Sequence, residues 1–372
     1  MNPSEETRRE GIDSERIPLE VLRSTSVSLG EVREMLSELS FMLQSGIPLF
    51  TSLGLISSHV RQNRFKKMIE KVRFDLSEGV PLSSALRQYP RAFNPVQTSM
   101  ILIGEASGNL DAALDDLVKM IDDERDLRDE IKKAVAYPIF MVSLSTLLIL
   151  GMLLFIFPKF RMIFLGFKAK LPIITTIFMN ASQFMVEHVE LIIGGLVIIP
   201  FTIFLFQNVT ALRYLWDRNK FKIPLFGRLF QSQVLARFGR IMGSLLSTGV
   251  PLVESLQLYR SVSTNLYIGE SFDLVIARVK EGVPLSDSLT ACYLFTPLTI
   301  QLIKTGENTG ELDTMAQRIF EFYRKRLSAK IKHLITILEP TLLAVMGGIV
   351  SIMAISVMLP LFRLAGQVRR AR

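Results

Sequence analysis

The sequence predicts an all-α protein made of two homologous cytoplasmic helical-bundle domains plus three transmembrane helices. The 372-residue chain is 49% apolar with a mean hydropathy of +0.34, which is high for a soluble protein. Apolar residues recur at helical spacing in both halves, without the alternation typical of strands. A string of glycine and proline turns also occurs twice in the chain. Together these observations indicate a duplicated helical fold attached to a membrane.

The repeated turns keep one register over the two halves. The chain reads SGIPL from Ser45, EGVPLS from Glu78 and GEASGNL from Gly104, then TGVPL from Thr248, EGVPLS from Glu281 and GENTGEL from Gly306. The first two motifs recur at an offset of 203 residues and the third at 202. Helix breakers kept in register at three places indicate an internal duplication.

Residues 1–30 are polar and mixed in charge, so we expect a flexible lead-in. No apolar signal segment stands there, which predicts a cytoplasmic N-terminus. Residues 31–136 are predicted to form the first cytoplasmic domain, with about six helices. Its apolar stripes end at turns that contain Gly46 with Pro48 and Gly79 with Pro81.

Residues 208–338 are predicted to form the second cytoplasmic domain on the same plan. Its stripes fall at the corresponding positions although many residues differ, and its turns contain Gly249 with Pro251 and Gly282 with Pro284. Substitution that spares the buried face predicts one fold used twice.

Three apolar segments, residues 137–158, 191–207 and 339–362, are predicted to cross the membrane as helices. The alternative, that they are buried core helices, is strongest for the short middle segment. Residues 159–190 then form a periplasmic connection and residues 363–372 a short C-terminal tail. The lysines and arginines beside the spans favour both domains in the cytoplasm. Two copies of one soluble fold should also face the same compartment.

The sequence offers no catalytic residue. It contains no phosphate-binding loop of the G-x-x-x-x-G-K-[ST] form and no G-x-S-x-G motif, and its three histidines stand far apart. The single cysteine, Cys292, excludes internal disulfides. We therefore expect neither an enzyme nor a cofactor.

The candidate site is the G-E-x-x-G motif, formed by Gly104, Glu105 and Gly108 and repeated as Gly306, Glu307 and Gly310. One interpretation is a tight turn whose glycines adopt conformations closed to other residues, with the glutamate accepting backbone N–H bonds at the start of the next helix. The other is a divalent-cation site that uses Glu105, Asp111 and Asp115. The second copy favours the turn, because Gln317 replaces the third acid. These residues and the turn glycines and prolines form a fold or partner-contact motif.

Charge distinguishes the two domains. Residues 31–136 contain 14 Lys and Arg against 16 Asp and Glu, whereas residues 208–338 contain 17 against 10. The difference predicts unequal partners, with anionic lipid as an alternative use of the positive excess. Nucleic acid is not expected, because the basic residues are not interleaved with stacking aromatic residues.

The combination of SGIPL, EGVPLS and GEASGNL with TGVPL, EGVPLS and GENTGEL resembles the inner-membrane platform protein of type II secretion systems and type IV pilus machines. The resemblance implies a non-enzymatic, multi-pass protein of the bacterial inner membrane. It would couple a cytoplasmic hexameric ATPase to the extraction and assembly of pilin-like subunits. Its other expected partners are inner-membrane assembly proteins, membrane lipid and a second copy in a dimer. The alternative is a small membrane transporter or channel component, which would need polar groups within its spans.

Overall fold

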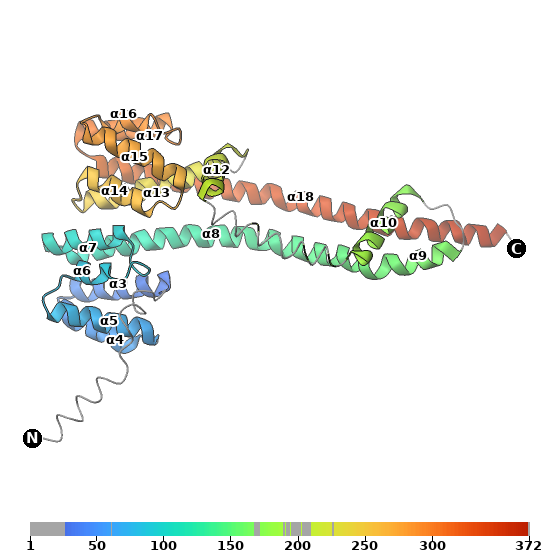
Figure 1. Cartoon of the computed structure of the whole chain (residues 1–372), viewed down its shortest axis with the longest axis horizontal. Helices are drawn as coiled ribbons and strands as arrows, with labels where there is room; N and C mark the ends of the chain where they lie inside the picture. Colours follow the sequence, from blue (N-terminus) through green and yellow to red (C-terminus); the bar gives the residue numbers. More distant parts are fainter. Residues whose placement is uncertain are drawn as a thin grey trace, which may run out of the picture. The chain divides into compact units, whose positions relative to one another are not determined.

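The computed structural model describes residues 27–60, 62–166, 172–188, 210–224 and 227–370, together with residues 190, 194 and 202. Every regular element in this part of the chain is a helix, which confirms the predicted all-α class (Figure 1). The chain divides into two compact units. The repeat unit extends to Leu127 and includes Asp217–Arg326, and the apolar unit comprises Arg128–Trp216 and Leu327–Arg372.

Each repeat contains six helices among the described residues. The first has α3 (Leu29–Gln44), α4 (Leu49–His59), α5 (Asn63–Ser77), α6 (Leu82–Arg87), α7 (Pro95–Ser107) and the start of α8 (Leu110–Gly151). The second has α13 (Gly227–Ser247), α14 (Leu252–Val262), α15 (Leu266–Lys280), α16 (Leu285–Leu289), α17 (Pro297–Thr309) and the start of α18 (Leu312–Arg370). The α12 helix (Thr210–Asn219) and the 3₁₀ turn η2 (Lys220–Lys222) precede the second repeat.

The repeated glycines and prolines lie where one helix ends and the next begins. Gly46 and Gly79 have φ values of +79° and +84°, and the corresponding Gly249 and Gly282 have +92° and +87°. This left-handed conformation strains residues that carry a Cβ. The four prolines that follow, Pro48, Pro81, Pro251 and Pro284, occupy the N-cap positions of α4, α6, α14 and α16.

The core of the repeat unit is one cluster of buried apolar side chains drawn from both repeats. The apolar residues that recur at helical spacing are buried, among them Leu39 and Phe65 in the first repeat and Met242 and Phe272 in the second. In the second repeat the ring of Phe238 packs edge-on against Tyr259, with centroids 5.3 Å apart. The helical periodicity of the sequence therefore identified the buried faces correctly.

The apolar unit contains the later parts of α8 and α18 with η1 (Met152–Ile156, a π-helix), α9 (Phe157–Gly166) and α10 (Ile173–Glu187). Leu153, Phe157, Met179 and Met353 form its small core. Two polar contacts reinforce this core, because Thr175 donates to the carbonyl of Ser356 at 2.9 Å and Ser182 donates to the carbonyl of Leu153.

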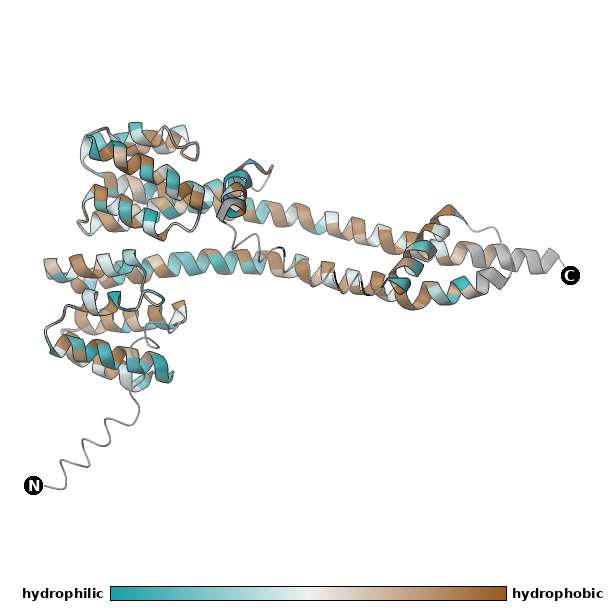
Figure 2. Cartoon of the chain, in the orientation of Figure 1, coloured by the Kyte–Doolittle hydropathy of each residue, from teal (hydrophilic) through white to brown (hydrophobic). Residues whose placement is uncertain are grey.

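Among the described residues, two helical stretches have the length and composition to span a membrane, Leu110–Met162 and Leu312–Leu359. In the later parts of both stretches the apolar side chains, among them Ile139, Leu147 and Val345, stay largely exposed within the protein, as lipid-facing residues would be. Figure 2 shows the apolar colouring along α8 and α18. The predicted third span, residues 191–207, lies outside the described residues except for 194 and 202, and stays a prediction. Of the predicted lead-in, only residues 27–30 are described.

Continuous helices join the repeats to the apolar segments. Pro138 lies inside α8, and α18 continues without interruption through Pro340. A proline inside a helix removes one backbone hydrogen bond. A helix that ended in lipid would leave several backbone groups without hydrogen bonds, because no water is present there. Continuing the helix through the proline therefore costs less free energy than ending it. Part of the predicted connection at 159–190 is helical too, in α9 and α10.

Candidate functional site at the junction of the two repeats

The glycines of the G-E-x-x-G motif have two different roles. Gly108 and Gly310 end α7 and α17 in the left-handed conformation, with φ of +74° and +75°. Gly104 instead lies inside α7, where a Cβ atom would stand 2.6 Å from the Cβ of Ala113 in α8. Gly306 is similarly close to the α18 backbone at Leu312, 3.0 Å away. The first glycine of each motif therefore permits close packing of two helices rather than an unusual backbone conformation.

The glutamate of the motif binds the start of a short helix. The carboxylate of Glu105 accepts the backbone N–H groups of Leu82 and Ser83, the first residues of α6. Glu307 accepts those of Leu285 and Ser286 at the start of α16.

The expected partner of each glutamate was the helix that follows the motif, whereas the observed partner precedes it. The reason is the N-cap proline of α6 and of α16, which provides no side-chain acceptor. The EGVPLS and G-E-x-x-G motifs thus meet within each repeat.

The three acids considered for a divalent cation are not gathered in one place. Both oxygens of Glu105 accept backbone hydrogen bonds, and Asp115 pairs with Lys119 at 2.7 Å. No group of three or more His, Cys, Asp or Glu side chains within the described part of the chain has an arrangement that could hold a metal ion.

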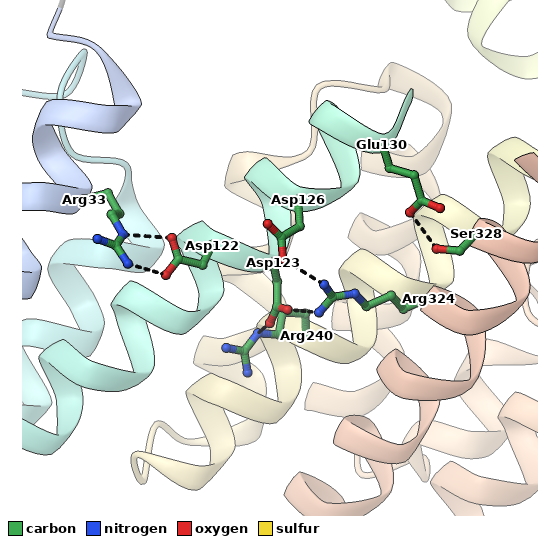
Figure 3. A network of polar contacts seen from close by, with 8 residues as sticks. All are labelled: Arg33, Asp122, Asp123, Asp126, Glu130, Arg240, Arg324 and Ser328. Atoms are coloured by element: carbon green, nitrogen blue, oxygen red, sulfur yellow. Dashed lines mark hydrogen bonds and ion pairs between the residues drawn. The ribbon is translucent and has the colours of Figure 1, made fainter. Parts of the chain in front are cut away.

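A different set of polar residues joins the two repeats. Helix α7 of the first repeat packs against α13 and α14 of the second. Beside this contact, Oδ2 of Asp123 in α8 lies 2.8 Å from Nε of Arg240 in α13. Arg324 in α18 donates to the other oxygen of Asp123 and also to Asp126, at 3.2 Å (Figure 3). One carboxylate of the first repeat therefore holds two arginines of the second.

The centre of this network is largely shielded from water. The side chains of Asp123 and Arg240 are 19% and 12% exposed. Burial raises the pKa of Asp123 above its ordinary value, against the opposing influence of Arg240 and Arg324. The ring of Phe320 lies beside both guanidinium groups, with its centroid 5.5 Å and 5.7 Å from their Cζ atoms. A cavity of about 110 Å³ adjoins the network and is lined by both repeats.

Two further contacts in Figure 3 stay within one repeat or one unit. Arg33 of α3 donates two hydrogen bonds of 2.8 Å to Asp122 of α8, and this pairing lowers the pKa of Asp122. In the apolar unit the hydroxyl of Ser328 donates to Glu130 at 2.7 Å.

The junction explains part of the charge difference between the repeats. At the offset of 202, Asp122, Asp123 and Asp126 correspond to Arg324, Lys325 and Ser328. The same segment of the long helix is thus acidic in one copy and basic in the other. Motif searching missed these residues because they form no motif, but this reversal of charge at one offset was a usable signal.

The observations so far define a protein with a duplicated helical repeat, each copy of which begins a long helix that becomes apolar and has the length and composition to span a membrane. The sequence model of the family "Type II secretion system (T2SS), protein F" matches this chain twice, over residues 35–158 and 238–360. These matches start 203 residues apart and end 202 apart, as the motifs do, and each extends through an apolar segment. The chain belongs to the type II secretion system protein F family.

Curated relatives come from two kinds of machine. The "Type IV pilus assembly protein PilC" of Myxococcus xanthus is 28% identical over 328 residues, which cover 88% of this chain and 79% of that protein. The "Type II secretion system protein F" of Pseudomonas aeruginosa is 29% identical over 332 residues, covering 88% and 81%. The protein of that name from Vibrio cholerae is 26% identical over 340 residues, covering 91% and 83%. Identity therefore does not separate the two kinds of machine.

Proposed function

We propose that this chain is the inner-membrane platform of a type IV pilus or type II secretion machine, where it couples a cytoplasmic ATPase to the extraction and assembly of pilin-like subunits. The proposal includes a non-enzymatic role and a homo-oligomeric platform. It is supported by the family membership and by the printed names of the relatives.

The observation that carries the coupling role is helix continuity. α8 runs from Leu110 in the first repeat to Gly151, and α18 runs from Leu312 in the second repeat to Arg370. Each helix begins directly after a glycine turn of its repeat, at Gly108 or Gly310, and continues unbroken into its apolar part. A continuous helix transmits torque or displacement, whereas a flexible tether does not.

Breaking this continuity tests the proposal. A Gly-Ser-Gly-Gly insert after Val135 in α8 should abolish pilus assembly or secretion in the bacterium that carries the gene. The level of the chain in the membrane and its co-purification with the ATPase should stay unchanged, since the repeats keep their surfaces. The same insert between Val60 and Asn63, in the connection between α4 and α5, is the control. Assembly at the normal level with the α8 insert would contradict coupling through this helix.

The proposal also has both repeats in the cytoplasm and residues 191–207 crossing the membrane. Cys292 is the only cysteine and is buried. In a Cys292→Ser chain, any maleimide labelling therefore comes from the engineered surface cysteine. Ser58→Cys and Ser261→Cys, one in each repeat, should resist an impermeant maleimide in intact cells and react after lysis. Labelling of either position in intact cells would contradict the topology.

A further inference from the structure

The junction between the repeats joins unlike faces of the same fold. The first repeat contributes its α7–α8 face. The second contributes its α13–α14 face, which corresponds to α3–α4 of the first, together with Arg324 and Phe320 of α18. Among the described helices, α17 packs against neither α3 nor α4. Such a heterologous contact leaves one face of each kind without a partner within the chain.

The α17–α18 face exposes large apolar side chains where the junction buries their counterparts. On this face, Leu298 and Phe322 are 45% and 41% exposed. Their counterparts Val96 and Met120 are buried and line the junction cavity. Exposed apolar groups at positions that mediate an existing contact indicate a second contact of the same kind.

The charges of the two faces are complementary, with the signs reversed relative to the junction. In the junction the acidic Asp123 and Glu124 of α8 line the same cavity as the basic Arg237 and Arg240 of α13. At the corresponding positions, Lys325 and Arg326 are exposed on α18, and Glu34 occupies the place of Arg237 on α3. Glu38, one turn along α3, adds a second acid. Pairing two α3 faces, or two α18 faces, would bring like charges together, which disfavours a contact between identical faces.

We propose that a second copy of this chain docks its α17–α18 face on the α3–α4 face of the first copy, in the manner in which the junction joins the two repeats. Each chain offers both faces, and the assembly that we propose is a two-fold dimer of four repeats in which the two chains exchange both contacts. This deepens the proposed function, of which a homo-oligomeric platform is part. It rests on the repeat geometry and not on the identity of the machine.

Site-directed cross-linking of the full chain in detergent tests the pairing. Met120 and Ile241 line one cavity in the junction, and their counterparts across the proposed contact are Phe322 and Glu38. In a Cys292→Ser background, a chain with Glu38→Cys and a differently tagged chain with Phe322→Cys should give a mixed dimer with a short bis-maleimide. Met120→Cys with Ile241→Cys in one chain is the positive control and should cross-link without forming a dimer. The proposal would be overturned if Glu38→Cys chains cross-linked to each other as much as to Phe322→Cys chains. It would also be overturned if the chain purified as a dimer but gave no cross-link between Glu38→Cys and Phe322→Cys chains.

Charge exchange gives an independent test that also guards against misfolding. Glu34→Arg and Arg326→Glu alone should each reduce the dimer fraction several-fold, because like charges then face each other. The chain with both substitutions should regain it. Glu70→Arg, on the exposed side of α5, is the control and should leave the dimer unchanged. Failure of the double variant to regain the dimer, when its helical content is normal, would overturn the pairing of these faces. Both assays omit the ATPase and the pilin-like subunits, so their outcome is separate from that of the assembly experiment.

Discussion

Asp123 of the first repeat and Arg240 of the second form an ion pair of 2.8 Å across the junction. The carboxylate also binds Arg324, yet burial still raises its pKa. The charged form of Asp123 is therefore tolerated in the folded protein mainly because two arginines face it. This makes the junction sensitive to the loss of either guanidinium group.

Arg240→Gln should destabilise the repeat unit by about 1–3 kcal/mol at neutral pH, because it leaves a half-buried carboxylate with one partner fewer. Adding Asp123→Asn to Arg240→Gln should recover most of this loss, since the uncompensated charge is then gone. The midpoint of urea unfolding, followed by pulse proteolysis of the full chain in detergent, measures both effects. Lys119→Gln, which removes an exposed pair on the same helix, is the control and should change little. Additive effects of the two junction substitutions would contradict this account.

The neighbouring Asp122 and Asp123 should give pH dependences of opposite sign. Arg33 lowers the pKa of Asp122 below 3.8, so its contribution to stability is present above that pH and is lost as the pH falls through the lowered value. Burial raises the pKa of Asp123, so its contribution is present below 3.8 and is lost as the pH rises through the raised value.

Urea midpoints of the unsubstituted chain, Asp122→Asn and Asp123→Asn between pH 3 and pH 7 measure this difference. The stability of the unsubstituted chain relative to Asp122→Asn should increase with pH, by less than about 1 kcal/mol because that pair is partly exposed. Its stability relative to Asp123→Asn should decrease over the same range. If both relative stabilities increased with pH, Arg240 and Arg324 would lower the pKa of Asp123 by more than burial raises it.

The motif glycines should respond differently to added methyl groups. Gly104→Ala should cost about 1–3 kcal/mol because its Cβ would meet that of Ala113 at 2.6 Å. Ala113→Gly in the same chain should restore part of this loss. Gly108→Ala has no atom within 4 Å of the new Cβ, so its cost of about 1 kcal/mol arises from the positive φ and should not respond to Ala113→Gly. Urea midpoints decide between these origins, and rescue of both variants by Ala113→Gly would refute the distinction.

The repeated glutamates should act as helix caps. Glu105→Gln should cost about 1–2 kcal/mol and speed hydrogen exchange at the amides of Leu82 and Ser83, because a charged acceptor is lost at the start of α6. Glu307→Gln should do the same at Leu285 and Ser286. Glu78→Gln, in the exposed turn before α6, is the matched control. Unchanged exchange combined with lost ATPase binding would make the motif a partner contact instead.

The turns of this fold were predictable because their chemistry is local. The sequence Gly-x-Pro predicts a glycine at positive φ and, two residues later, a proline at the N-cap of the next helix. The recurrence of this pattern at one offset in the second repeat supported the prediction. The function of Glu105 was only half predictable, since its partner helix lies more than twenty residues upstream and depends on how α6 and α7 pack.

The reversal of charge at the offset of 202 pointed to this segment of α8, but the sequence could not single out Asp123 as the residue that pairs with the second repeat. Asp123 differs from Asp115, Asp116 and Asp122 only in the direction in which α8 presents it to the second repeat. The sequence showed that the repeats differ in charge, and this suggested unequal external partners. The structure shows that part of the difference is satisfied between the repeats themselves, so the charge of an isolated repeat overstates what is available to a partner.

The first repeat should fold without the rest of the chain. Residues 27–132 contain the capping box of Ser28 and Glu31, all six helices and a buried core, and about 100 residues suffice for an independent domain. Its circular dichroism spectrum should be helical, and a disordered or strand-rich spectrum would contradict the prediction.

Separation from the second repeat leaves Asp123 and Asp126 unpaired, so the fragment should bind a fragment of residues 210–335. This affinity should fall as salt rises, because the attraction between the separated charged surfaces is screened over about 8 Å at physiological ionic strength. In the first fragment, Asp123→Asn with Asp126→Asn should flatten the salt dependence, whereas Asp115→Asn should leave it unchanged. An affinity that is insensitive to both salt and these substitutions would assign the junction to the apolar contact of α7 with α13 and α14 instead of to its ion pairs.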